Sequence, residues 1–405
     1  MGSLGIVGAK RQFLLGFMIV LSVALSCVLG CAGQKPRALE RSIDPDAWRF
    51  EQARRATGLD TPARVADTHV VLLMIDGVRW QDVFRGVDRA LARKHGLSAR
   101  EHVSAAALMP NLHGIIARRG VALGAPRQGA IAASGPNFVS VPGYMEAFTG
   151  RKPHCRANDC PTITEPTLVD EFAAVPGARL GDVAVFASWP GIEKAASFAP
   201  AHIVMSVGRT HGTNHDVIRG SAQGARLLLA GTKAGPGPGG GDFRRDAATA
   251  HLALHYLRER RPRFLFLGLG EPDEYGHHDD YGSYLRSLRS ADSVIGEVDR
   301  ALAELAASGR QTLLIVATDH GRSAGFRHHG AAHPESARVW LVASGTLVTA
   351  RGYPAMPFGA RRLSDIAPTI RSLSHLPADR SSGAGRVLNE VFLAGAMEQE
   401  KYALE

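Results

Sequence analysis

Three short apolar runs, each followed closely by an acidic side chain, constrain the fold of this chain more than any other feature of its sequence. The runs have the length and apolar content of buried parallel strands, and they are His69–Ile75, Phe264–Leu269 and Leu313–Ala317. Asp76, Asp273 and Asp319 come after them in that order. Because α/β proteins place ligands at the carboxyl ends of their strands, the sequence predicts one site built from these strand ends.

Other segments predict the remaining elements of an α/β protein. Weaker strands are expected at Val183–Ala187, Ile203–Val207 and Val339–Ala343. Apolar residues at helical spacing and turn signals predict helices at Pro110–Gly120, Tyr284–Ala307 and Ser364–Leu373. The apolar stripe of the long second helix is expected to be core. With 405 residues, the chain can form one large α/β domain or two smaller ones.

Composition and charge narrow the classes of partner. Hydrophobic residues make up 45% of the chain, which is enough for a sizeable core and argues against global disorder. The formal charge of +9 comes from scattered Lys and Arg, without a long basic run or a nucleic-acid-binding motif. The sequence therefore argues against a nucleic-acid partner and favours a small anionic substrate.

The N-terminal residues 1–31 are typical of a targeting segment. Two basic residues precede an apolar run, Phe13–Leu29, and Val28–Cys31 resembles the cleavage box of a bacterial lipoprotein. The alternative is an uncleaved anchor helix, whose length is just under that of a comfortable span. Both interpretations place the body outside the cytoplasm, on the periplasmic side, and make this segment its only membrane contact. Residues 32–66 are polar and are expected to form a tether.

Two cysteines flank a short polar loop. Cys155 and Cys160 are separated by four residues, and an exported protein lies in a compartment where disulfides persist. A metal site is the alternative, but the sequence has no second pair that would complete a tetrathiolate site. A local disulfide is therefore the favoured prediction.

A serine stands at an expected strand-to-helix turn. Ser140 comes after the short apolar pair Phe138-Val139 and just before a segment compatible with a helix, Tyr144–Thr149. Such a serine would lie near helix N–H groups that stabilise negative charge. Taken alone, the segment would be interpreted as an ordinary turn that contains a serine.

Imidazoles accompany the carboxylates at the strand ends. His277 follows Asp273 after an expected tight turn at Gly276, so that both could reach one ion, and His320 and His329 follow the third strand. Mixed carboxylate and imidazole ligands favour zinc, with manganese or iron as alternatives. Two such ions can stabilise both the attacking and the leaving oxygen of a displacement.

In the order and spacing of these motifs, the sequence resembles the alkaline phosphatase superfamily, in particular its phosphodiesterase and phosphopentomutase-like branches. The resemblance runs from His69 to Leu373, and its motifs lie at Asp76-Gly77, Pro110–Leu112, Ser140–Tyr144, Asp273–His277, Thr318–Gly321, His329-Gly330 and Asp365–Thr369. It implies an α/β/α sandwich with a mostly parallel central sheet and the site along its C-terminal edge. The catalytic domain would span residues 67–395, with a cap or insertion around 151–260 that shapes substrate choice.

The resemblance also implies roles for individual residues. Ser140 would be the nucleophile and would form a covalent phospho-enzyme that water hydrolyses. One divalent ion would be held by Asp76, Asp319, His320 and the Ser140 oxygen. The second would be held by Asp273, His277 and His329, with His328 as the alternative to His329. Asn137 is a weaker candidate for touching substrate oxygens, and Asn111 and Asp365 are expected to cap helices. Zinc is the expected metal, with manganese as the alternative.

The substrate group is less constrained. Sulfatases of the same superfamily mature their nucleophile in a C/S-x-P-x-R motif, but Tyr144 stands where that motif requires Arg. The sequence therefore favours a hydrolase of phosphoric esters, either a phosphatase or a phosphodiesterase. A sulfatase-like hydrolase and a phospho-headgroup transferase of the envelope remain the alternatives.

Overall fold

The computed structural model of the protein describes residues 68–127, 130–348, 352–353 and 360–389. The predicted signal segment 1–31, the tether 32–66 and the end of the predicted domain at 390–395 lie outside these residues. Within the described part, no helix is long and apolar enough to cross a membrane.

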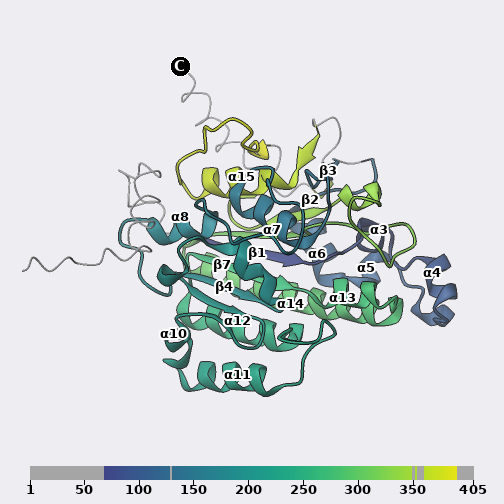
Figure 1. Cartoon of the computed structure of the whole chain (residues 1–405), viewed down its shortest axis with the longest axis horizontal. Helices are drawn as coiled ribbons and strands as arrows, with labels where there is room; N and C mark the ends of the chain where they lie inside the picture. The colour runs from purple at the N-terminus through teal and green to yellow at the C-terminus, as the bar shows by residue number, and fades with distance from the viewer. Residues whose placement is uncertain (1–67, 128–129, 349–351, 354–359, 390–405) are drawn as a thin grey trace, which may run out of the picture. The chain divides into compact units, whose positions relative to one another are not determined.

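An eight-stranded sheet forms the centre of the fold (Figure 1), with the strand order β2-β9-β8-β1-β7-β4-β5-β6. Five neighbouring strands, from β8 to β5 in this order, are parallel, whereas β9 and β6 run antiparallel to their neighbours. These strands are β1 Thr68–Ile75, β2 Gly120–Leu123, β4 Val183–Ala187, β5 Val204–Val207, β6 His211–Thr213, β7 Phe264–Leu269, β8 Gln311–Ala317 and β9 Leu341–Ser344. A separate small sheet pairs β3 Ile131–Ala132 with β10 Arg361–Arg362.

Helices cover both faces of the large sheet (Figure 1). The helices of the first half are α3 Trp80–Arg85, α4 Arg89–Lys94, α5 Ala105–Leu108, α6 Pro110–Arg118, α7 Ser140–Thr149, α8 Leu168–Ala174 and α9 Glu193–Ala196. Those of the second half are α10 His215–Arg219, α11 Ala222–Lys233, α12 Asp246–Arg260, α13 Glu271–His277, α14 Tyr281–Ala307 and α15 Ile366–Leu373. The predicted α/β/α sandwich with a mostly parallel sheet is confirmed.

Strand β1 shows how the apolar runs build two cores. Val70, Leu72 and Met74 pack in one apolar cluster, and the alternate residues of β1 pack in the other. The first cluster includes side chains of α7, α8 and α15, and the second includes side chains of α6, α12 and α14. Because side chains of a strand alternate between the faces of a sheet, a continuous apolar run is needed where helices cover both faces.

The range 151–260, expected to form a cap, contributes largely to the sandwich itself. β4 pairs with β7 and with β5 inside the central sheet. Residues of α12 lie in the same apolar cluster as residues of β1. The sequence predicts these two strands, but they are only five and four residues long, and their place in the central sheet is visible only in three dimensions. Whether the remainder of the range shapes substrate choice stays a prediction.

Two other local predictions can be compared with the structure. Cys155 and Cys160 are joined by a disulfide, as predicted. The expected tight turn at Gly276 is wrong, because Asp273 and His277 lie on one helix, α13. Pro272 occupies the first turn of this helix, where a proline is well tolerated.

Candidate metal centre

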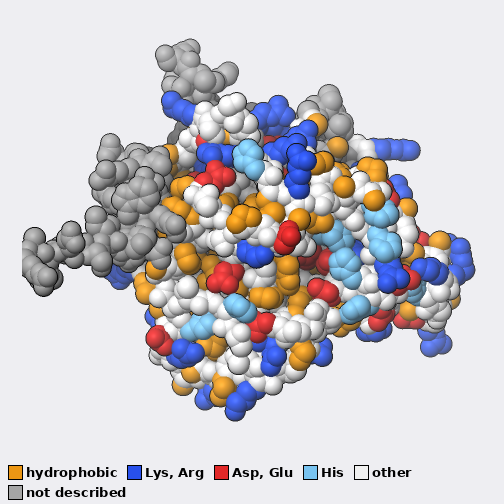
Figure 2. All heavy atoms as spheres, in the orientation of Figure 1, with side chains coloured by type: hydrophobic (Ala, Val, Ile, Leu, Met, Phe, Trp, Pro, Cys, Tyr) orange, Lys and Arg blue, Asp and Glu red, His pale blue; other side chains and the backbone are white. Residues whose placement is uncertain are grey.

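The candidate site lies at the carboxyl ends of three neighbouring parallel strands in the middle of the central sheet. β7, β1 and β8 are adjacent in the sheet, and Asp273, Asp76 and Asp319 follow their carboxyl ends. Ser140 reaches the same place as the first residue of α7. Figure 2 shows histidine side chains gathered on the face where Figure 1 places α13.

The first predicted ligand group is assembled in the structure. Asp76, Asp319 and His320 are buried, and one ligand atom of each lies within 4.8 Å of the other two. Ser140 Oγ donates a hydrogen bond of 3.3 Å to Asp76 Oδ1 and lies 3.4 Å from His320 Nε2. The four residues predicted to share one ion therefore surround a common point.

The second predicted group lies beside the first. His277 Nε2 is 2.9 Å from Asp273 Oδ2 and 3.1 Å from His329 Nε2, and His329 Nε2 is 3.9 Å from the same carboxylate oxygen. In α13, Asp273 and His277 are four residues apart and so lie on one face of the helix. Asp273, His320 and His329 form a further close set, which places His320 next to both groups.

Backbone carbonyls fix how two of the imidazoles face the site. His320 Nδ1 lies 2.9 Å from the oxygen of Gly321, and His329 Nδ1 lies 2.8 Å from the oxygen of Phe138. A carbonyl can only accept, so each Nδ1 carries the proton that it donates. In a neutral ring, Nε2 then presents its lone pair to the centre of the site, as in metal-binding histidines.

One buried oxygen tests whether these residues suit a cation. Asp319 Oδ2 accepts no hydrogen bond from the residues that the structure describes, although the side chain is fully buried. The other oxygen of this carboxylate accepts from the N–H of Gly77 at 3.1 Å. Buried carboxylate oxygens are normally paired or bound to a metal. Asp319 Oδ2 lies 3.4 Å from His320 Nε2 without accepting a hydrogen bond from it, and this position among oxygen and imidazole ligand atoms fits a divalent cation.

The charges of the first group depend strongly on one another. Burial opposes protonation of His320, but the carboxylate of Asp319 and the hydrogen bond to Asp76 outweigh it and raise the pKa to about 10. Burial and the neighbouring Asp76 raise the pKa of Asp319 well above its ordinary value. Burial, together with the charge of His320, lowers the pKa of His329 to about 3. The protonation states of Asp319 and His320 are therefore linked, and a bound cation would compete with protons for the same donor atoms.

Arg322 belongs to the site, although the sequence analysis did not identify it. The side chain is buried and pairs with Asp273 through Nη1. Burial raises the pKa of Asp273, but the Arg322 charge and the hydrogen bond from His277 outweigh it and hold that pKa well below its ordinary value. Arg322 itself is fixed by the carbonyls of Phe326 and Arg327, at 2.6 and 2.7 Å. Its position directly after Asp319-His320-Gly321 was the available signal.

Tyr144 is a second residue of the site whose contact with Asp76 the sequence did not predict. Its hydroxyl donates to Asp76 Oδ2 at 3.0 Å, and the ring is buried against Phe266. The position was singled out because a sulfatase motif has Arg there. The structure places a neutral donor on a ligand carboxylate instead of a cation.

Asn137 has its amide group occupied by backbone partners. Its Nδ2 donates to the carbonyl of Arg156 at 2.7 Å, and its Oδ1 accepts from the N–H of Ala331 at 2.7 Å. The predicted contact with substrate oxygens therefore stays untested, and the observed geometry is that of a bridge between two loops. His328 stacks on His333 rather than joining the ligand groups that the described residues form.

A sizeable cavity among the described residues lies away from the candidate site. It has a volume of about 940 Å³ and is bordered by α11, α12 and α14. None of the predicted metal ligands lines it. The candidate site thus rests on the convergence of donor atoms and not on the size of a hollow.

Comparisons with known proteins agree with this architecture. No family model matches the chain. A putative sulfatase from Bacteroides thetaiotaomicron superposes with a TM-score of 0.50 at 14% identity, over 80% of this chain and 74% of that protein. The alkaline phosphatase PafA superposes with a TM-score of 0.50 at 12% identity, over 81% of this chain and 99% of the phosphatase. At these identities the likeness shows a shared fold.

One curated relative is similar in sequence over a short region. It is a 2,3-bisphosphoglycerate-independent phosphoglycerate mutase from Moorella thermoacetica, 27% identical over 113 residues. The match spans 28% of this chain and only 21% of the mutase. It therefore concerns one part of each protein.

Proposed function

The chain has the fold of the alkaline phosphatase superfamily, and from this premise we propose that it is a metal-dependent hydrolase of phosphoric esters with Ser140 as its nucleophile. The observation that carries the proposal is the position of Ser140 Oγ. It lies 3.3 Å from Asp76 Oδ1 and 3.4 Å from His320 Nε2, at the first residue of a helix. A serine there faces both a set of cation ligands and the positive end of a helix dipole.

The ligand sets are assigned as predicted from the sequence. Asp76, Asp319, His320 and Ser140 would hold one divalent ion, and Asp273, His277 and His329 would hold the other. Zinc suits this mixture of carboxylate and imidazole donors, and manganese is the alternative. Bound there, the ions would supply positive charge that lowers the pKa of the serine hydroxyl and neutralises the phosphate oxygens.

Residues of the chain supply orientation and charge for the reaction. The hydrogen bond from Ser140 to Asp76 aims the hydroxyl oxygen, and the first turn of α7 presents N–H groups that favour an anionic group. The serine oxygen would attack phosphorus, a new O–P bond would form, and the bond from phosphorus to the ester oxygen would break. Water would then hydrolyse the phosphoserine and release phosphate.

Tyr144 supports a phosphate over a sulfate ester. The buried ring occupies the position at which a sulfatase motif carries Arg, and its hydroxyl is bound to Asp76. The sulfatase-like alternative would therefore need to work without that guanidinium. An envelope transferase has no specific observation in its favour among the described residues.

A single experiment tests the proposal. The purified full-length protein would be assayed for bound metal and for release of p-nitrophenol from p-nitrophenyl phosphate, bis-p-nitrophenyl phosphate and p-nitrophenyl sulfate. We expect two divalent ions per chain and chelator-sensitive release from one or both phosphates. Release from the sulfate alone would contradict the assignment of Tyr144, and absence of both metal and turnover would contradict the hydrolase.

The cellular location belongs to the same proposal. An exported protein, held on the periplasmic side through a lipid at Cys31, would act on small anionic phosphate esters outside the cytoplasm, with the membrane touched only by the N-terminal lipid or anchor. Cys31→Ser should abolish metabolic labelling with a radioactive fatty acid. Labelling of the variant at the wild-type level would contradict this attachment site.

A further inference from the structure

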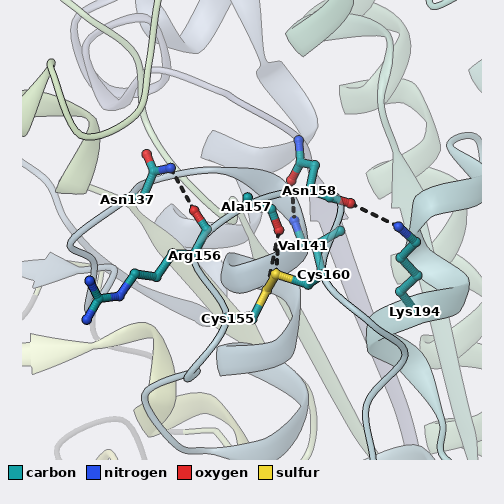
Figure 3. The surroundings of a disulfide bond; sticks show 8 residues. All are labelled: Asn137, Val141, Cys155, Arg156, Ala157, Asn158, Cys160 and Lys194. Carbon is teal, nitrogen blue, oxygen red and sulfur yellow. Dashed lines mark hydrogen bonds between the residues drawn. A yellow bond between two sulfur atoms is a disulfide. The ribbon is translucent and has the colours of Figure 1, made fainter.

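The disulfide closes a short loop that leads from α7 towards α8 (Figure 3). Cys155 and Cys160 are its ends, and Arg156 and Asn158 between them are exposed. An exposed loop of this kind loses considerable conformational freedom when it is ordered. A cross-link removes part of that freedom in advance. The loop is therefore held ready to make specific contacts.

The first contact is with the helix that begins at Ser140. The N-cap residue of α7 is Val139, which has no polar side-chain atom and so cannot cap the helix itself. Asn158 supplies the missing acceptor from the loop, because its Oδ1 accepts from the N–H of Val141 at 2.9 Å (Figure 3). Lys194 Nζ donates a hydrogen bond of 3.2 Å to the backbone carbonyl of Asn158. The first turn of the nucleophile helix is thus capped from the disulfide loop.

The second contact is with the segment that carries His329. Asn137 donates to the carbonyl of Arg156 at 2.7 Å, and its own carbonyl oxygen accepts from Ala331 at 2.7 Å. Ala331 lies two residues after His329, whose ring is fixed by the carbonyl of Phe138 at 2.8 Å. Through Asn137, the disulfide loop is connected to both a predicted ligand and the segment that leads into α7.

We propose that the disulfide-closed loop 155–160 is a positioning element of the active site, with Asn158 and Asn137 as its positioning residues. Asn158 fixes the first turn of α7 and so the direction of the Ser140 hydroxyl. Asn137 fixes the spacing between that turn and His329. The catalytic consequence rests on the proposed hydrolase, whereas the structural consequence can be measured without it.

The kinetic test uses the metal-loaded full chain and p-nitrophenyl phosphate. The double variant Cys155→Ser/Cys160→Ser should lower kcat about tenfold, equivalent to about 1.4 kcal/mol of barrier, with KM changed less than threefold and the metal content unchanged. Asn158→Ala should give a similar loss. Combining all three substitutions should cost little more than the cysteine double variant alone, because opening the loop already disturbs the contact between Asn158 and Val141. Additive losses, or wild-type kcat in both variants, would overturn the proposal.

Two matched variants distinguish the hydrogen bond between Asn158 and Val141 from other effects of changing the loop. Asp159→Asn changes an exposed neighbour of Asn158 in the same loop and should keep wild-type kcat. Asn158→Asp keeps the acceptor for Val141 but adds a negative charge, so KM for an anionic ester should rise while kcat stays within threefold of wild type. A tenfold loss of kcat in Asn158→Asp, or in the Asp159 control, would contradict a role through the Val141 contact.

Hydrogen exchange provides the readout that does not depend on turnover. Peptides covering the first turn of α7 should exchange at least fivefold faster in the cysteine double variant and in Asn158→Ala, but at the wild-type rate in Asp159→Asn. Faster exchange in a protein whose wild type has no turnover would support the positioning element and count against the hydrolase. Unchanged exchange in both variants would overturn the positioning element even if the wild type is an active phosphatase.

Discussion

Ser140 is the residue whose replacement most directly tests the chemistry. Ser140→Ala removes the attacking oxygen but leaves six of the seven predicted ligand side chains in place. We expect turnover of p-nitrophenyl phosphate to fall by at least 10³-fold, while bound metal, measured by elemental analysis, stays near the wild-type value. Turnover within tenfold of wild type would show that another group is the nucleophile.

Asp319 is the sharpest test of the metal ligands, because one of its buried oxygens lacks a hydrogen-bond partner among the described residues. Asp319→Asn keeps the shape of the side chain and removes its negative charge. We expect bound metal to fall from two ions to about one per chain, since the ion coordinated through Asp76 and His320 would lose an anionic ligand. Asp159→Asn, the same change at an exposed position, is the control, and equal metal content in both variants would remove Asp319 from the ligand list.

Replacing Arg322 should lower the free energy of unfolding by an amount that depends on whether metal is bound. Its guanidinium pairs with the buried Asp273 carboxylate, so Arg322→Gln would leave that carboxylate without its nearest positive partner. Removing one member of a buried pair costs about 3 kcal/mol or more. We expect chelator-treated Arg322→Gln to lose about that much free energy of unfolding in urea titrations, and metal-loaded protein to lose less. Arg327→Gln, at an exposed neighbouring position, should change stability by less than about 0.5 kcal/mol.

At the scale of residues, the sequence predicted the donors but not their supports. Carboxylates and imidazoles after apolar runs are visible in a linear pattern, and those predicted as ligands lie close together in the structure, except for the alternative His328. Arg322 and Tyr144 could not be assigned in the same way, because their roles depend on which ligand carboxylate each side chain meets in three dimensions. The prediction that Asn137 touches substrate oxygens stays untested, but its two backbone partners, Arg156 and Ala331, lie 19 and 194 residues away and could not be predicted from the sequence.

Among the elements, the segment after α15 is held to the segment after α7 by an ion pair. Arg151 Nε lies 2.6 Å from Asp379 Oδ2. Burial opposes ionisation of Asp379, but hydrogen bonds from Arg151 and Ser381 outweigh it and lower the pKa to about 2. Because the folded pKa lies below the ordinary value of about 3.9, the pair stabilises the folded protein above about pH 4 and loses this contribution as the pH falls towards 2.

Asp379→Asn tests this pair. Arg151 is partly exposed, so solvent screening limits the effect, and we expect the variant to lose about 0.5–1 kcal/mol of unfolding free energy at pH 7. The difference from wild type should shrink steadily in denaturant titrations between pH 4 and pH 2. A difference that stays constant over this interval would mean that the carboxylate of Asp379 does not stabilise the fold through its charge.

Elements were predictable where one physical signal dominated. β4 and β7 have the predicted bounds because short apolar runs in a doubly covered sheet have few alternatives. α13 was mistaken for a turn because its seven residues include a proline, a glycine and several charges. Its helical form depends on tertiary contacts such as that of Asp273 with Arg322, and local propensity does not report these.

For the whole molecule, the two ligand groups predict that metal and stability are linked. Asp76 and Asp319 are buried with carboxylate oxygens within 4.8 Å of one another, and Asp273 is also buried, with Oδ1 4.0 Å from His320 Nε2. Negative charges gathered in this way oppose folding unless a cation is bound. We expect chelation to lower the thermal midpoint by at least 5 °C and addition of zinc or manganese to restore it. An unchanged midpoint at saturating chelator, with metal loss verified, would contradict a metal centre in this place.

The sheet order also governs when this site can come into existence during synthesis. β1 lies near the start of the described chain. It pairs on one side with β8, which is more than two hundred residues later in the chain, and on the other side with β7. A ribosome-bound chain that stops before β8 lacks Asp319, His320 and His329 altogether. Such a high contact order makes closure of the sheet a late step. The proposed ions could therefore bind to complete ligand sets only after the chain has been made as far as His329, and a shorter product would lack such a set.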